Sequence, residues 1–345
     1  MKNFQSERLA HKKKFYKKRW FKLSLFVIII IVAVGGFFAW KTGYIMNKIS
    51  GSGNSALGSL LSGSKALSGD NGRTNILLLG MRGASDPHGG LLADSIMVAS
   101  FDTKNNKVGL ISVPRDLYVQ IPGTNERGKI NSVYSYWQSG GRAQGMEKME
   151  EMMGTITGLK IDHAVVINFD GFKQLIDTVG GVDVRILKPF TEPKQFVEGN
   201  ECGGVFSLPA GTNRLNGDKA LCYARARETT NDFDRSKRQQ VILKALKDKL
   251  VTLGTLADFG KLNNILTIIG NNVKTNLTPD EMKGFYDQFI SLKEADIVQR
   301  VFENSEKGLL KVPGTGGVGY VLVPIAGQDN YSQMQTACRD IFTQQ

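Results

Sequence analysis

The sequence predicts an α/β domain whose central mixed sheet carries helices on both faces, preceded by one N-terminal transmembrane helix. Short apolar runs alternate with segments of helical periodicity, which is the pattern of a sheet covered by helices. A basic tail followed by a long apolar segment predicts the membrane helix. The 345 residues are enough for one large domain or two modest ones.

Short apolar runs of the kind found in buried strands begin at residue 75. Runs 95–101 and 108–113 are joined by the polar segment 102–107, so we expect these two strands to form a hairpin. The other predicted strands cover 75–79, 164–167, 182–186, 298–302 and 320–323.

Periodicity and end signals predict the helices. A methionine stripe at helical spacing marks a helix within 146–156, and paired glycines at 180–181 end another within 172–179. The segment Thr278-Pro279-Asp280-Glu281 is a capping box with proline at the first helical position, so a helix begins there. Further helices are predicted at 216–223, 235–253 and 331–342.

The N-terminal region divides into three segments. Residues 1–22 hold nine Lys or Arg side chains against Glu7 alone, so this cytoplasmic tail carries about +8 of the formal +12. Residues 23–40 are apolar, and as a helix they are about 27 Å long, close to the hydrocarbon thickness of a bilayer. Residues 41–73 are rich in Gly and Ser and predict an extracellular stalk. The catalytic domain is then expected at 74–255, followed by an extension at 256–345.

A cleaved signal peptide is the alternative interpretation of residues 23–40. The apolar run is long, and no small-residue cleavage site precedes an acceptable cut near Trp40, so we expect an uncleaved, single-pass anchor in the cell membrane. The basic tail places the N-terminus in the cytoplasm and the folded domain outside. Because the domain then lies across the membrane from DNA, nucleic acid is not an expected partner.

The three cysteines are Cys202, Cys222 and Cys338. In an oxidising compartment Cys202 and Cys222 could pair and close a loop of about 20 residues, stabilising the fold by about 3 kcal/mol. The alternative is three separate buried thiols. No Cys–His spacing resembles a zinc site.

Arginines are concentrated between residues 215 and 240. Four of them surround an acidic pair, and a further Arg–Asp pair ends the predicted strand 108–113. Guanidinium groups bind phosphate with two parallel hydrogen bonds, so this density predicts a phosphate site. The alternative is surface ion pairing with neighbouring carboxylates such as Glu228. The residues concerned are Arg115, Asp116, Arg225, Arg227, Asp232, Asp234, Arg235 and Arg238.

Two spacings constrain the geometry of this cluster. Arg225 and Arg227 share a face only on an extended segment, so we expect the preceding helix to end near Arg225. Arg235 and Gln239 are four residues apart and share a face of the next helix.

A polar loop enters a predicted strand at Asp94. Ligand residues are commonly carried at such strand ends, although a turn or cap role is the alternative. The loop also holds Asp86 and His88, either of which could reach a metal ion. Lys129, followed by Ile130 and Asn131, offers another cation after a Gly-containing loop.

These residues form an ordered set of motifs. The set comprises DS-I at 94–96, S-V-PRD at 112–116, KIN at 129–131, NF-D-F at 168–172, D-x-x-GGV at 177–182, and LNG-x-x-AL-x-Y-x-R-x-R with D-x-x-R-x-x-RQ between 215 and 239. In this respect the chain resembles the LytR–CpsA–Psr family of cell-wall glycopolymer ligases over about residues 75–253.

The resemblance implies an activity. Family members hold a polyprenyl-pyrophosphate-linked glycan, with the lipid in an apolar tunnel, and transfer the glycan phosphate to a sugar hydroxyl of peptidoglycan. It implies Mg²⁺ or Mn²⁺ as cofactor, in keeping with the oxygen ligands available. Membrane lipid and peptidoglycan are then partners.

The motif positions imply roles for individual residues. The pyrophosphate ligands are implied to be Arg115, Lys129, Arg225 and Arg227. Asp94 is implied to be a metal carboxylate, and the remaining polar groups of the catalytic site are Asp232, Arg235 and Gln239. We expect Asp232, ahead of Asp94, to act as the base on the acceptor hydroxyl.

The chain departs from the family pattern after the first strand. Many members have a G-x-D aspartate there, whereas this chain reads Gly80-Met81-Arg82, so Asp86 or His88 is the candidate replacement at the metal. Two other functions keep the same arginines: a lipid-linked pyrophosphatase with water as acceptor, and a non-catalytic membrane regulator that binds polyanionic glycans.

Overall fold

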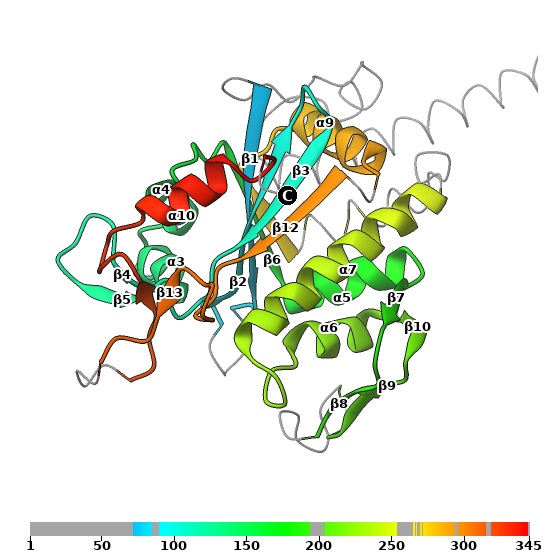
Figure 1. Cartoon of the computed structure of the whole chain (residues 1–345). Coiled ribbons are helices and arrows are strands. Elements are labelled where there is room, and N and C mark those ends of the chain that lie inside the picture. Colours follow the sequence, from blue (N-terminus) through cyan, green and yellow to red (C-terminus); the bar gives the residue numbers. More distant parts are fainter. Residues whose placement is uncertain are drawn as a thin grey trace, which may run out of the picture.

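The computed structural model describes residues 72–84, 90–193, 202, 204–253, 265, 267, 270, 272–293, 296–314 and 319–343. Its centre is a six-stranded sheet in the order β11-β6-β1-β2-β3-β12. The strands are β1 (Arg73–Met81), β2 (Ala93–Asp102), β3 (Lys107–Ser112), β6 (His163–Asn168), β11 (Val273–Thr275) and β12 (Ile297–Val301). Figure 1 shows this sheet in the middle of the molecule.

The sheet is mixed, as predicted. β2 runs antiparallel to β1 and to β3, so the expected hairpin between β2 and β3 is confirmed. β6 runs parallel to β1, and β12 runs parallel to β3. β11 pairs antiparallel with β6 at the opposite edge.

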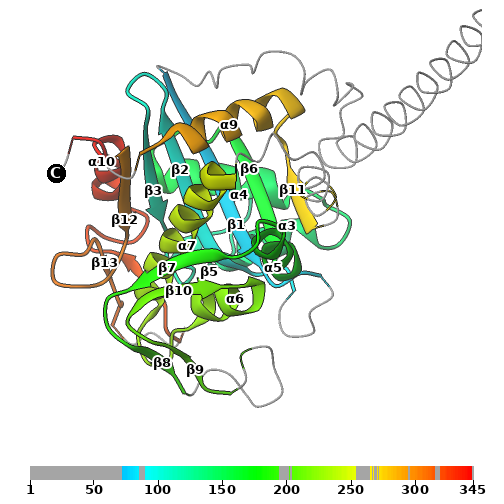
Figure 2. The ribbon, with the colours of Figure 1, turned by 90° about the vertical axis from the view of Figure 1, so that its right-hand side faces the viewer.

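Helices cover both faces of the sheet because its strands are apolar on both sides. On one face lie α3 (Asn131–Gln138), α4 (Gly145–Thr157) and α10 (Ser332–Arg339), packed on Leu77 and Val98. On the other face Ile76 and Phe101 contact α7 (Asp232–Leu253) and α9 (Pro279–Ser291). Successive residues of a strand point to opposite faces, so β1 and β2 supply both cores. Figure 2 shows α7 and α9 lying in front of the sheet.

A smaller layer lies beyond α7. It comprises α5 (Phe169–Thr178), α6 (Gly217–Arg225) and the antiparallel pair β7 (Val182–Ile186) and β10 (Gly211–Leu215). The predicted strand 182–186 therefore forms, but in its own two-stranded sheet. A projecting ribbon of β8 (Phe190–Glu192) and β9 (Phe206–Leu208) extends this layer, as Figure 2 shows. The structure joins Cys202 to Cys222 by a disulfide, while Cys338 is a buried free thiol.

Two short ribbons complete the described elements. β4 (Tyr118–Gln120) pairs with β5 (Arg127–Lys129), and β13 (Leu310–Lys311) pairs with β14 (Val323–Pro324). The predicted strand 320–323 is thus shorter and begins later, since only one bridge, Leu117 to Leu322, precedes β14.

Helix ends follow local capping chemistry. The capping box at Thr278 and Glu281 is present, and Gly180 and Gly181 adopt the left-handed conformation after α5. The start predicted for α7 is wrong by three residues. The helix begins at Asp232 because the Asn231 side chain accepts a hydrogen bond from the Asp234 amide at 2.8 Å.

Segments on both sides of residue 255 build the central sheet. β11 and β12 supply its two edge strands, and α9 covers one face. The described part of 256–345 therefore completes the sheet on which the site stands. The transmembrane helix expected at 23–40 lies outside the described residues, and none of the helices described is long and apolar enough to cross a membrane.

Candidate active site

The sheet gathers charged residues at one of its ends. β1 and β3 finish there, and β2 begins there, because β2 is antiparallel to both neighbours. Arg82 therefore follows the end of β1, Asp94 lies at the start of β2, and Arg115 follows the end of β3. A register shift between Gly80 and Met81 marks the same end of the sheet.

Arg115 is at the centre of an ion-pair network. Its Nη1 donates to Asp94 Oδ1 at 2.5 Å, and its Nε lies 3.6 Å from Asp232 Oδ1 and 3.8 Å from Asp116 Oδ2. Asp116 in turn accepts from Lys129 Nζ at 2.5 Å. The structure thus brings Asp94, Arg115, Lys129 and Asp232 together, as the sequence predicted.

The first turn of α7 adds the second guanidinium. Arg235 Nη2 donates to the Asp94 backbone carbonyl at 2.7 Å and to Asp232 Oδ2 at 3.0 Å. Because α7 begins at Asp232, this aspartate and Arg235 are three residues apart on one helical face. The early helix start therefore creates the Asp232–Arg235 pair.

Three buried polar atoms in this network make no well-aligned hydrogen bond among the described residues: Arg115 Nε, Asp232 Oδ1 and Arg235 Nε. Asp232 Oδ1 nevertheless lies 2.9 Å from Arg235 Nη2, as an ion pair. Such atoms cost free energy unless a ligand or water satisfies them. The two guanidinium donors suit the oxygens of an anionic ligand, and the carboxylate acceptor suits a hydroxyl group that binds beside that ligand.

Burial and charge shift the pKa values in this network in opposite directions. Burial raises the pKa of Asp232, although attraction to Arg235 and Arg115 opposes that shift. Burial lowers the pKa of Arg235. For Arg115 burial also acts to lower the pKa, but the combined attraction of Asp94, Asp232 and Asp116 outweighs it, so the pKa is raised.

Arg225 reaches this region from the end of α6. The helix ends at Arg225, as predicted, and Ala226 is extended. The Arg225 guanidinium lies 4.9 Å from the centre of the Phe169 ring, and Arg82 lies 5.9 Å from the same ring. Phe169 therefore holds two cations beside the end of the sheet. Arg227 Nε lies 3.6 Å from Glu228 Oε1.

Gln239 and Arg238 attach α7 to its neighbours. Gln239 Oε1 accepts from Ser95 Oγ at 2.8 Å, and its Nε2 donates to the Ala224 carbonyl at 3.3 Å. Arg238 Nε donates to the Tyr223 carbonyl at 3.1 Å, and its Nη2 donates to the Ala226 carbonyl. Arg238 thus satisfies carbonyls at the C-terminus of α6, where a cation is favourable.

Two residues contribute to the site in ways that the sequence did not predict. Asp116, which the sequence placed in the arginine-rich cluster without a role of its own, holds Lys129 and contacts Arg115. Phe169 follows Asn168 at the end of β6, but its contact with two guanidinium groups needs the two arginines to meet across the fold. Of the predicted metal ligands, Asp86 and His88 lie outside the residues that the structure describes.

The described side chains offer hard oxygen donors but no preformed metal cage. They contain no group of three or more His, Cys, Asp or Glu side chains placed to hold a metal ion. Asp94 is paired with Arg115 and lies 3.8 Å from Arg82 Nε. A single carboxylate still fits Mg²⁺, which usually takes one or two carboxylates and completes its shell with water and substrate phosphate.

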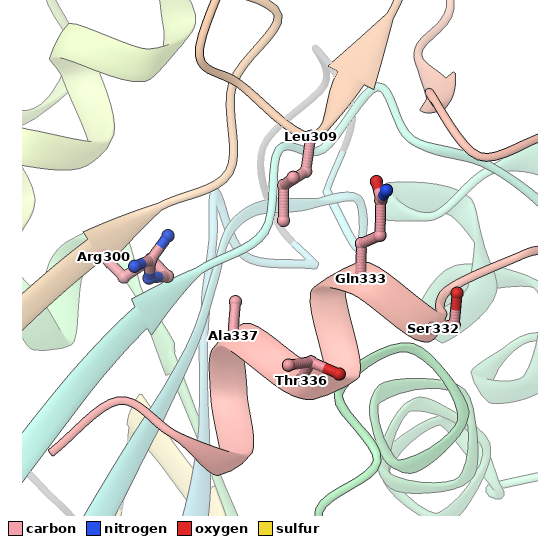
Figure 3. Close-up of a pocket in the computed structure, with 6 residues that line it drawn as sticks. All are labelled: Arg300, Leu309, Ser332, Gln333, Thr336 and Ala337. Carbon is pink, nitrogen blue, oxygen red and sulfur yellow. The ribbon is translucent and has the colours of Figure 1, made fainter. Parts of the chain in front are cut away.

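A pocket of about 430 Å³ lies elsewhere, between β12 and α10. Figure 3 shows Leu309 and Ala337 pointing toward one another across it. Its lining consists of Arg300, Leu309, Ser332, Gln333, Thr336 and Ala337. None of the predicted site residues lines this pocket, so we place the candidate site at the ion-pair network.

Fold and site together define a class of protein: an α/β domain with a mixed sheet that gathers guanidinium and carboxylate groups at one of its ends. The chain belongs to the LytR_cpsA_psr family, whose model matches residues 44–336. The resemblance drawn from the motifs is therefore confirmed.

Known proteins agree with this assignment. A relative from Bacillus mycoides (strain KBAB4), the polyisoprenyl-teichoic acid–peptidoglycan teichoic acid transferase TagU, is 32% identical over 74% of this chain and 75% of its own length. The transferase TagV of Bacillus subtilis (strain 168) is 35% identical over 58% of this chain and 50% of its own. The crystal structure of B. subtilis TagV matches with a TM-score of 0.60 and 26% identity, covering 80% of this chain and all of that one.

Proposed function

We propose that this protein is a phosphotransferase that moves a glycan phosphate from a polyprenyl-pyrophosphate-linked glycopolymer to a sugar hydroxyl of peptidoglycan. The activity named for the TagU and TagV relatives supports a transferase that attaches a glycopolymer to peptidoglycan. The lipid carrier rests on the family resemblance and on the arginine chemistry of the site.

One observation carries the proposal. Arg115 Nε, Arg235 Nε and Asp232 Oδ1 are buried in one network and make no well-aligned hydrogen bond within the described part of the chain, although Asp232 Oδ1 lies 2.9 Å from Arg235 Nη2. Phosphoryl oxygens would satisfy the two donors, and the acceptor's hydroxyl proton would satisfy the carboxylate. The same three atoms thus match the two reactants of a phosphoryl transfer.

The reaction forms one bond and breaks one. The acceptor hydroxyl oxygen attacks the phosphorus attached to the glycan, and the bond from that phosphorus to the bridging pyrophosphate oxygen breaks. Polyprenyl phosphate leaves with the bridging oxygen, and Asp232 takes the hydroxyl proton. Arg115, Arg235 and Lys129 stabilise the negative charge that develops on the phosphoryl oxygens.

Arg225 and Arg227 are assigned to the second phosphate. Their support is position: Arg225 ends α6, Arg227 lies two residues further along the chain, and Phe169 holds Arg225 beside Arg82 at the end of the sheet. A divalent metal, Mg²⁺ or Mn²⁺, would be held by Asp94, with Asp86 as a further candidate, and would neutralise phosphate charge.

The location follows from the same proposal. A substrate on a membrane lipid and an acceptor in the wall require a domain that stands outside the cell membrane. The basic tail and the apolar residues 23–40 supply that topology.

The test is a reconstituted transfer reaction. The full chain in lipid vesicles, a short-chain polyprenyl pyrophosphate disaccharide and soluble uncrosslinked peptidoglycan strands should yield strands that carry the disaccharide through a phosphodiester. Mass spectrometry of the products decides the reaction. Free disaccharide phosphate as the sole glycan product would assign a pyrophosphatase, and no turnover with intact donor binding would assign a binding protein.

A further inference from the structure

The C-terminal segment is anchored directly beside the ion-pair network. The Leu322 amide donates to the Asp116 carbonyl at 2.9 Å, and the Tyr118 amide donates to the Leu322 carbonyl at 2.8 Å. Leu117 and Leu322 are 0% and 1% exposed and belong to the same apolar core. The backbone that follows Arg115 and Asp116 is therefore fixed to residues near the end of the chain.

Tyr320 precedes this anchor by two residues and is unlike its neighbours. Val321, Leu322 and Val323 are buried, whereas Tyr320 is 52% exposed. Tyr320 is thus a large aromatic residue that is half in solvent. Because the residues that follow it are fixed in the core, its backbone is held in place although its side chain is not part of that core.

The anchor places Tyr320 near the carboxylates that border Arg115, because Tyr320 is two residues from the Leu322 amide that donates to the Asp116 carbonyl. In keeping with this position, partial burial, and then the negative charges of Asp116 and Asp232, raise the pKa of Tyr320. Its neutral hydroxyl stays available as a hydrogen-bond donor at physiological pH.

An exposed tyrosine at such a site has a specific chemistry. One ring face presents a flat apolar surface, and the hydroxyl forms hydrogen bonds at the rim. A sugar ring offers the complement, with C–H groups on its face and hydroxyls at its edge. The arginines assigned to phosphate supply hydrogen-bond donors, whereas the Tyr320 ring adds an apolar surface for the face of an uncharged sugar.

We propose that Tyr320 binds the acceptor sugar and sets acceptor specificity by stacking on the sugar ring next to Asp232. This assignment rests on the proposed transfer reaction and names the acceptor subsite of that same site. It makes the C-terminal segment, outside the arginine motifs, a contributor to substrate recognition.

Binding measurements on the full chain test the assignment without relying on turnover. The probes are soluble uncrosslinked peptidoglycan strands for the acceptor and a short-chain polyprenyl pyrophosphate disaccharide for the donor. Tyr320→Ala should weaken strand binding about tenfold, an ordinary effect for one aromatic contact, and leave donor binding unchanged. Tyr320→Phe, which keeps the ring, should bind strands more tightly than Tyr320→Ala.

The matched control is Ile325→Ala. Ile325 is 41% exposed and lies on the same segment beyond the Leu322 anchor. It is therefore an exposed apolar side chain like Tyr320, but on the other side of the anchor. This variant should bind both probes like the parent. Equal loss of strand binding in both alanine variants would assign the effect to the segment as a whole and overturn the proposal.

Other outcomes also decide. Unchanged strand binding in Tyr320→Ala overturns the assignment, and so does loss of donor binding, which would place Tyr320 in the pyrophosphate site or in the fold. If the parent binds strands but transfers nothing, the proposed function is contradicted. The comparison of strand binding between variants still decides whether Tyr320 contacts the sugar. A parent that does not bind strands overturns the acceptor subsite.

Discussion

At the residue scale, Asp232 and Asp94 occupy different environments. The buried Asp232 Oδ1 lies 2.9 Å from Arg235 Nη2 without a well-aligned hydrogen bond to any described residue, whereas Asp94 Oδ1 accepts a hydrogen bond from Arg115 Nη1 at 2.5 Å. We therefore expect Asp232→Ala to lower turnover about 10²–10⁴-fold, the usual contribution of a positioned base. Asp94→Ala should weaken Mg²⁺ binding, so this variant should recover part of its activity when the Mg²⁺ concentration is raised. Titration of Mg²⁺ in the transfer assay checks both, and identical curves for the two variants would show that the roles are divided wrongly.

The titration of Asp232 should be visible in the pH profile. Burial raises its pKa, and the negative charge of Asp116 adds to that shift. A base acts only when deprotonated, so kcat/KM should fall as pH drops through this raised pKa. Asp116→Asn removes a like charge and should move the acid limb to lower pH. A limb that stays in place, or moves to higher pH, would exclude Asp232 as the titrating base.

Arg225 and Arg227 test whether geometry matters beyond charge. Replacing either by Lys keeps the positive charge but loses the planar fork, so donor binding should weaken by about 1.5–3 kcal/mol. The measurement is the dissociation constant of the lipid pyrophosphate donor. Lys237→Arg, an exposed change in α7 away from the network, serves as the control. Parent-like affinity in both Lys variants would remove these arginines from the pyrophosphate site.

At the element scale, the Cys202–Cys222 disulfide ties α6 to the region of the β8–β9 ribbon. It closes a loop of 20 residues, which stabilises the fold by about 3 kcal/mol in the chain-entropy description. The double variant Cys202→Ala, Cys222→Ala should lose about that much free energy of unfolding in denaturant. Reductant should destabilise the parent and leave the double variant unchanged. A parent insensitive to reductant would show that the bond contributes nothing to stability.

At the scale of the whole molecule, the basic tail and residues 23–40 predict a single-pass topology with the folded domain outside. The test uses a reporter that is active only outside the cytoplasm. Fused after Gln345, this reporter should therefore be active in intact cells. The control fusion after Lys22 lacks the apolar segment and should remain inside. Reporter activity in the cytoplasm from the full-length fusion would contradict both the topology and a function at the wall.

Much of the fold was predictable because its signals are local. The strands at 75–79 and 95–101 are apolar on both faces, and the methionine stripe repeats at helical spacing. The start of α7 was missed because the capping role of Asn231 depends on one hydrogen bond rather than on periodicity. β7 was recognised as a strand, but nothing in its alternation tells which sheet it joins.

The sequence by itself determined the class of the domain and most members of its site, since the ordered motifs carry the arginines and aspartates. The tertiary structure decided how they meet. Antiparallel β2 places Asp94 between the ends of β1 and β3, and the α7 start sets Asp232 against Arg235. It also decided that Tyr320 approaches Asp116 from a segment 200 residues later in the chain, because Leu322 packs into the core beside Leu117. Periodicity and propensity act over a few residues, so contacts between distant segments depend on packing of the whole core.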